Sequence, residues 1–243
     1  MQNYIIWLLL FIALPALSAT YYFVSFGEAV DRTFLSISTF LFSIFTGFFI
    51  SRQAGRFNRV RDLVTRFDGV MSNIYRTSIH VSVDIQKSIG TVIKSHYRKI
   101  FSTKKWDYHF SHKSTTLKSL HTLLDEMVDD DKVTKVSNQA LGAIIKGLAA
   151  AQDIRKSIVA LNHERIPKEQ WALIIIFAFI VVSAVSTLSS VGQVLPAILK
   201  AGFVVAVLAV LYILLRLDKL IFSEDIMGYD SASDVLDIIN NKK

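Results

Sequence analysis

Residues 34–56 read FLSISTFLFSIFTGFFISRQAGR, an apolar segment of membrane-spanning length that ends in arginines. Ser36, Thr39, Ser43 and Thr46 recur within it at spacings of three and four, so a helix would gather them on one stripe. Two roles remain open for this hydroxyl stripe. It can line a pore whose bore is narrowed by the flanking phenylalanine rings, or it can pack closely against another membrane helix.

The rest of the chain is typical of a membrane protein. Of its 243 residues, 52% are hydrophobic and only 19% are charged, and the apolar residues come in long blocks. There is no cysteine, which excludes disulfides and thiolate metal sites. The net charge of +7 is better explained by membrane topology and lipid headgroups than by nucleic acid.

Four apolar segments are long enough to cross a bilayer, at residues 4–26, 34–50, 171–190 and 197–217. We therefore expect an all-α membrane protein with four transmembrane helices and a helical cytoplasmic domain inserted between the second and third. The predicted domains are residues 1–50 (helices 1 and 2), 51–170 (cytoplasmic domain), 171–217 (helices 3 and 4) and 218–243 (cytoplasmic tail).

Lysines and arginines concentrate in residues 51–170, and the positive-inside rule places this block, and with it both termini, in the cytoplasm. Arg52, Arg56 and Arg59 follow the second span directly and would form a basic mouth that concentrates anions. Apolar periodicity predicts one continuous helix through residues 57–93, a loop at 102–116, helices at 117–127 and 133–162, and a tail helix at 231–239.

Charge is sparse inside the predicted spans. No carboxylate lies mid-membrane, which argues against a proton-coupled motor or antiporter. Lys200 lies near the outer end of the fourth span, where it either attracts anions to an outer vestibule or extends its amine to the interface.

No catalytic, metal or cofactor site is expected. His109, His112 and His121 lack the convergent spacing of a metal site and read as exposed residues. The acidic run 129–131 is explained by helix capping more simply than by a divalent cation. Glu224, Asp225 and Asp230 lie close to the membrane exit, but a calcium site there would need several converging oxygens and is not expected.

Three stretches resemble bestrophin-like membrane proteins of bacteria, a group related to the bestrophin anion channels. They are FTGFFISRQAGRFNRVRDLV at 45–64, RIPKEQW at 165–171 and LDKLIFSED at 217–225. The last departs from the bestrophin pattern because Ile221 and Ser223 replace a proline and a glycine. The resemblance implies a homopentameric channel of the bacterial inner membrane, whose neck residues on the second span correspond here to Leu41, Phe45 and Phe49.

The functional prediction is an oligomeric, anion-conducting membrane channel whose second span lines the pore. Its partners would be the lipid bilayer, other copies of the chain and a permeant small ion, with no nucleic acid. The alternative is a membrane-anchored scaffold or sensor that binds a partner through its cytoplasmic helices.

Overall fold

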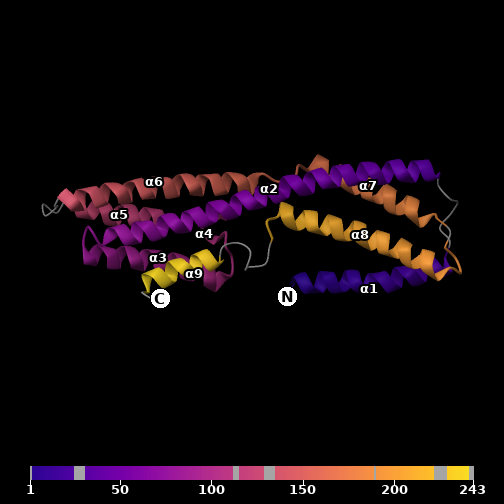
Figure 1. Ribbon diagram of the computed structural model, residues 1–243, viewed down its shortest axis with the longest axis horizontal. Coiled ribbons are helices and arrows are strands. Elements are labelled where there is room, and N and C mark those ends of the chain that lie inside the picture. Colours follow the sequence, from indigo (N-terminus) through magenta and orange to yellow (C-terminus); the bar gives the residue numbers. More distant parts are fainter. Residues whose placement is uncertain are drawn as a thin grey trace. The chain divides into compact units, whose positions relative to one another are not determined.

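The computed structural model describes residues 2–24, 31–111, 115–128, 135–188, 190–221 and 229–240, and its regular structure within these ranges is helical. In chain order the helices are α1 (Gln2–Phe23), α2 (Arg32–Ser78), α3 (Val83–Thr103), α4 (Tyr108–Ser111), α5 (Thr116–Val128), α6 (Lys135–His163), α7 (Lys168–Ser186), α8 (Val194–Asp218) and α9 (Tyr229–Ile239) (Figure 1). The all-α prediction is confirmed.

The chain divides into two compact units. Unit 1 comprises Met1–Gly55 and Arg165–Ile221, and unit 2 comprises Arg56–Glu164 and Phe222–Lys243. Each unit is therefore assembled from two separate pieces of the chain.

Unit 1 is built from apolar helices. Helix α1 packs along α8 (Figure 1), and the buried core residues include Phe42 and Phe49 of α2, Ile174 and Val181 of α7, and Leu214 of α8. Within the described residues, α2, α7 and α8 are long and apolar enough to cross a membrane, whereas the apolar stretch Ile12–Phe23 of α1 is shorter. Three candidate spans are thus found, and α1 as a fourth span stays a prediction.

Unit 2 contains the amphipathic helices. Phe57, Val60, Val64, Phe67 and Ile74 of α2 are buried, as their periodicity predicts. The prediction that this helix continues through residue 93 is wrong, because α2 ends at Ser78 and α3 begins at Val83. Apolar periodicity persists across the break, but Ser82 caps α3 by accepting a hydrogen bond from the Asp84 backbone N–H at 3.2 Å.

The predicted loop at 102–116 contains a short helix. Lys104 adopts a left-handed φ of 52° and ends α3, and α4 then forms over Tyr108–Ser111. Phe110 of α4 is buried and packs its ring edge-on against Phe67, with centroids 5.6 Å apart. This aromatic contact holds α4 against α2.

Two glycines of α6 provide a matched test of the packing in unit 2. A methyl group added at Gly147 would lie 2.9 Å from Ile74 Cγ1, whereas one added at Gly142 would meet no atom within 4 Å. We expect Gly147→Ala to lower the free energy of unfolding by about 1–2 kcal/mol, because overpacking exceeds the gain in helix propensity. Gly142→Ala should raise it by about 0.5–1 kcal/mol. Thermal unfolding of the two variants in detergent measures both, and equal shifts of the same sign would contradict the close α2–α6 contact.

Candidate pore face and polar clusters

The four hydroxyls of the predicted stripe lie on the boundary between the exposed and buried sides of α2. Ser36 and Ser43 are exposed, Thr39 is half-buried and Thr46 is buried. Three of the hydroxyls donate to the carbonyl four residues earlier: Ser36 to Arg32, Ser43 to Thr39 and Thr46 to Phe42, at 2.9, 2.8 and 2.5 Å. These three hydroxyls are therefore satisfied within their own helix, and Ser36 and Ser43 form the exposed edge of the stripe.

The three predicted neck residues do not lie on the exposed side of α2 that carries Ser36 and Ser43. Leu41 is 36% exposed, Phe45 is half-buried and stacks on Phe177 with ring centroids 5.4 Å apart, and Phe49 is 4% exposed. Phe49 packs with Ile166 and Leu214 in the core of unit 1. Because each helical residue turns by about 100°, Ser43 and Phe45 point to nearly opposite sides of α2, and one axis cannot receive both.

The surface that α2 does present is mixed in character. Phe40, Ile44 and Phe48 are 65%, 51% and 60% exposed. Ser36, Ser43 and Gly47 are exposed beside them, and a methyl group added at Gly47 would meet no atom within 4 Å. We call these six residues the exposed α2 face. The exposed side chains of α7 in the same unit are dominated by larger apolar groups: Leu173, Ile175, Ile176 and Phe179.

The predicted basic mouth separates into two kinds of arginine. Arg52 and Arg59 are exposed, but Arg56 is buried. The Arg56 guanidinium donates from Nε to the Leu161 carbonyl at 2.6 Å and from Nη2 to the Asn162 carbonyl at 3.0 Å. These carbonyls lie in the last turn of α6, where the helix leaves acceptors without an internal partner and favours a cation. Arg56 therefore caps α6, and only Arg52 and Arg59 present charge to solvent.

Lys200 is buried within unit 1 and does not extend to the surface. Its Nζ donates to the Leu188 carbonyl and to Ser190 Oγ, at 3.3 Å for the second, and lies 4.4 Å from the centroid of the Tyr21 ring. Ser190 Oγ in turn donates to the Tyr21 carbonyl at 2.9 Å, and the Tyr21 hydroxyl pairs with Ser186 Oγ at 2.7 Å. The amine thus joins the ends of α1, α7 and α8, and its role in an outer vestibule stays a prediction.

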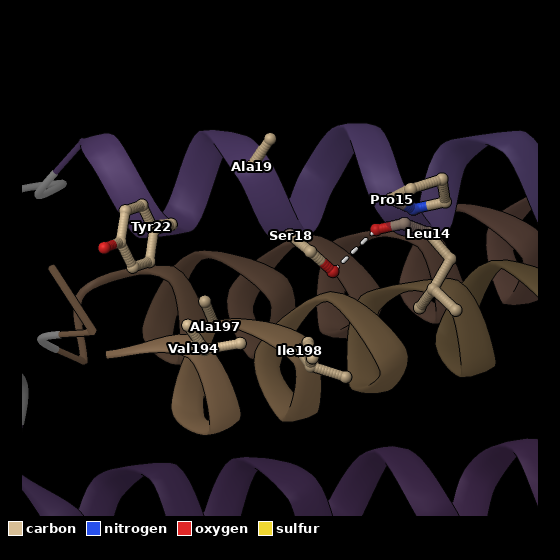
Figure 2. Close-up of a pocket in the computed structure, with 8 residues that line it drawn as sticks. All are labelled: Leu14, Pro15, Ser18, Ala19, Tyr22, Val194, Ala197 and Ile198. Atoms are coloured by element: carbon tan, nitrogen blue, oxygen red, sulfur yellow. Dashed lines mark hydrogen bonds between the residues drawn. The ribbon is translucent and has the colours of Figure 1, made fainter. Parts of the chain in front are cut away.

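One pocket brings two of the predicted site residues together. Thr39 and Lys200 both line a cavity of about 400 Å³, with Leu35, Leu199 and Phe203 among its apolar walls. A second pocket, of about 590 Å³, lies between α1 and α8 and is lined by Leu14, Pro15, Ser18, Ala19, Tyr22, Val194, Ala197 and Ile198 (Figure 2). Its one short hydroxyl, Ser18, is already bonded to the Leu14 carbonyl at 2.8 Å, which leaves an almost wholly apolar groove.

Asp218 is a buried carboxylate at the end of α8 that holds the approach to α7. Oδ1 accepts the Ile166 backbone N–H at 2.7 Å, and Oδ2 accepts the Trp171 indole N–H at 3.3 Å. Asp218 of the stretch beginning at Leu217 therefore contacts Ile166 and Trp171 of the stretch at 165–171, two of the three stretches quoted above. Asp218 was not among the predicted site residues, although it lies within one of the motifs that carried the resemblance.

A second buried carboxylate, Asp68, joins three helices of unit 2. Oδ1 accepts the Tyr97 hydroxyl of α3 at 2.6 Å, and Oδ2 accepts the Ser231 hydroxyl of α9. Burial raises the pKa of Asp68 to about 6, although the two hydrogen bonds oppose this shift, and burial likewise raises the pKa of Tyr97. The sequence could have indicated this buried carboxylate, because Asp68 lies four residues after Val64 and three before Met71. That spacing places it on the same buried side of α2 as these two residues.

Two histidines pair beside this cluster. The His96 and His109 rings stack with centroids 3.8 Å apart, His96 Nδ1 contacts Thr116 Oγ1 at 2.9 Å, and His109 Nε2 contacts the His96 carbonyl at 2.9 Å. Burial, with the neighbouring His109, lowers the pKa of His96 well below its usual value. The interpretation of His109 as an exposed loop residue is wrong, because α4 turns its ring onto α3.

No group of three or more metal-ligating side chains occurs within the described ranges. The acidic runs 129–131 and 224–225 and His112 lie outside those ranges.

Comparison with known families gives one match. The family model described as the Bestrophin-like domain matches residues 6–219, which include all of the predicted pore and mouth positions. No curated protein and no solved structure matches the chain.

Proposed function

The chain belongs to the Bestrophin-like family, and on that premise we propose that it forms an oligomeric membrane channel that conducts anions along an axis surrounded by α2. The family relationship also supports a homopentamer in a bacterial inner membrane, with four spans and both termini in the cytoplasm. No residue in this proposal performs chemistry, because permeation requires only a passage of suitable polarity and width.

The observation that carries the proposal is the exposed α2 face. Within a helix apolar enough to span a membrane, Ser36, Ser43 and Gly47 alternate with large side chains such as Phe40 and remain uncovered by their own subunit. Small and polar residues let helices approach closely, and hydroxyls beside rings suit a narrow aqueous passage. We assign the pore to this face. Of the predicted residues, Ser36 and Ser43 belong to it, whereas Leu41, two residues before Ser43, points to nearly the opposite side of α2.

The remaining predicted pore residues take supporting roles in this arrangement. Phe45 stacks on Phe177, while Thr46 and Phe49 are buried, so these side chains would fix the rotation of α2 about its axis. Arg52 and Arg59 are exposed and would supply the positive potential that attracts anions at the cytoplasmic end.

Gly47 is the sharpest test position, because a methyl group added there meets no atom of the subunit within 4 Å. Purified protein in planar bilayers should conduct, and we expect Gly47→Leu to lower the current per reconstituted channel about tenfold or more by filling the passage. Gly142→Leu is the matched control, since that glycine also faces open space but lies on α6. Phe45→Ala is less informative, because it also removes a ring contact within the subunit.

The direction of selectivity follows from reversal potentials measured in a chloride gradient, which should approach the chloride equilibrium potential. An unchanged current in the Gly47→Leu variant would show that this face of α2 does not line the pore. Wild-type protein without current, together with a stoichiometric cytoplasmic partner in pull-downs, would favour the scaffold instead.

A further inference from the structure

A concave groove on unit 2 gathers positive charge that the channel proposal does not use. It lies among α3, α4 and α5 and has a volume of about 930 Å³, within the range of small-molecule sites. One wall is a single face of α3 that bears Lys94, Arg98 and Lys99, while the opposite face of that helix, with Ile93 and Tyr97, is buried.

The other wall of the groove is polar as well. Thr116 and Ser119 of α5 bring hydroxyls to it, and Tyr108 and His109 of α4 bring rings. None of the described residues that line the groove is a carboxylate. The ion pairs found in the described ranges join Lys87 to Asp84 and Lys156 to Asp153, so none of them neutralises the three groove cations.

An ordinary amphipathic helix also exposes lysines and arginines, but such a face is normally convex and open to water. Here Lys94, Arg98 and Lys99 lie along one side of a hollow, and the Ser119 hydroxyl lies on the opposite wall. Arg98 and Lys99 are exposed, and the Thr116 hydroxyl on that wall is paired with His96 Nδ1. Concentrated positive charge in a concave, low-dielectric setting attracts anions more strongly than the same charge on an open surface. Phosphate and carboxylate both match a guanidinium fork, and phosphate has additional acceptor oxygens for a neighbouring lysine and hydroxyl.

We propose that this groove binds a phosphate-bearing small ligand, with Arg98 and Lys94 contacting the phosphate and Tyr108 beside its organic part. The site is independent of the pore, since all its residues belong to unit 2. The same chemistry describes a soluble nucleotide and the headgroup of an anionic phospholipid, and the two sources are separated by the probes used below.

The test is isothermal titration calorimetry of the full chain in neutral detergent at low salt. Three probes are titrated: inorganic pyrophosphate, ATP and dioctanoyl phosphatidic acid. We expect at least one to bind, and Lys94→Gln with Arg98→Gln to weaken that binding by about tenfold or more, because two charge-assisted contacts are lost. Lys146→Gln, an exposed lysine of α6 outside the groove, is the control and should bind as the wild type does.

Binding of ATP or pyrophosphate indicates a soluble ligand, and binding of phosphatidic acid alone indicates a lipid headgroup. Either outcome supports the site when the paired substitution weakens the binding by about tenfold or more. Absence of binding with all three probes, or binding that the paired substitution leaves unchanged, overturns the proposal. Lys99→Gln alone provides a milder variant if the double substitution lowers the unfolding temperature. Current through the channel has no part in the readout, so failure of this test leaves the pore proposal untouched.

Discussion

Replacement of Asp218 by alanine is expected to lower the free energy of unfolding of unit 1 by about 3–4 kcal/mol. The substitution removes a buried carboxylate that accepts both the Ile166 backbone N–H and the Trp171 indole N–H. The two donors would remain inside the protein without their charged acceptor, which costs more than losing the hydrogen bonds alone. This loss is a large share of the stability of a typical domain.

The size of the effect depends on the acceptor geometry, so a graded series is informative. Asp218→Asn keeps one carbonyl oxygen but brings an NH₂ group against the second donor, and an intermediate loss is expected. Lys219→Ala changes the exposed neighbour and should have little effect. Thermal unfolding in detergent provides the measurement. If the Asp218→Ala variant unfolds at the same temperature as the wild type, the Asp218 carboxylate does not stabilise the start of α7.

The second large effect concerns Asp68 and its dependence on pH. Because burial raises its pKa from 3.8 to about 6, the folded protein binds this proton more tightly than the unfolded chain does. The ionisation of Asp68 therefore does not affect the free energy of unfolding below about pH 4. As the pH rises towards 6 it lowers this free energy, and above pH 6 the loss reaches about 3 kcal/mol. Asp68→Asn should remove this cost, since the amide can accept from Tyr97 and donate to Ser231 without ionising.

Asp68→Asn is thus expected to be more stable than the wild type by up to about 3 kcal/mol at pH 7.5 and equal to it near pH 4. The relevant quantity is the difference between the two unfolding temperatures across this range, which cancels the titration of the other carboxyls. Asp62→Asn, an exposed position on the same helix, controls for loss of one negative charge. A difference that is negative or constant with pH would show that Asp68 is not the titrating group.

The order of helices followed from the sequence because amphipathic and apolar periods are local properties. The predicted helix at 133–162 corresponds to α6 (Lys135–His163), and the predicted tail helix at 231–239 corresponds to α9 (Tyr229–Ile239). The break after Ser78 was missed because the apolar period continues through Val81 and Ile85. The helix is interrupted before Ser82, whose hydroxyl caps α3, although the pattern of hydrophobic residues continues unchanged.

The candidate site was less predictable, since it depends on which side of each helix meets its neighbours. Spacing alone grouped Ser36 with Thr46, but packing exposes the first and buries the second. Charge alone grouped Arg56 with Arg52, yet the carbonyls that Arg56 caps lie more than a hundred residues later in the chain. Contacts of this kind have no local signature.

The two-piece construction of unit 2 has a consequence for how the protein is made. Its final element, α9, contributes the buried side chains Ala232, Val235 and Ile239 and the Ser231 hydroxyl bonded to Asp68. A ribosome produces these residues only after α7 and α8 have been synthesised. The amphipathic helices of unit 2 must therefore wait, with part of their apolar surface uncovered, until membrane insertion of the later segments is under way. A nascent chain that stops after residue 221 would leave that surface to chaperones and proteases.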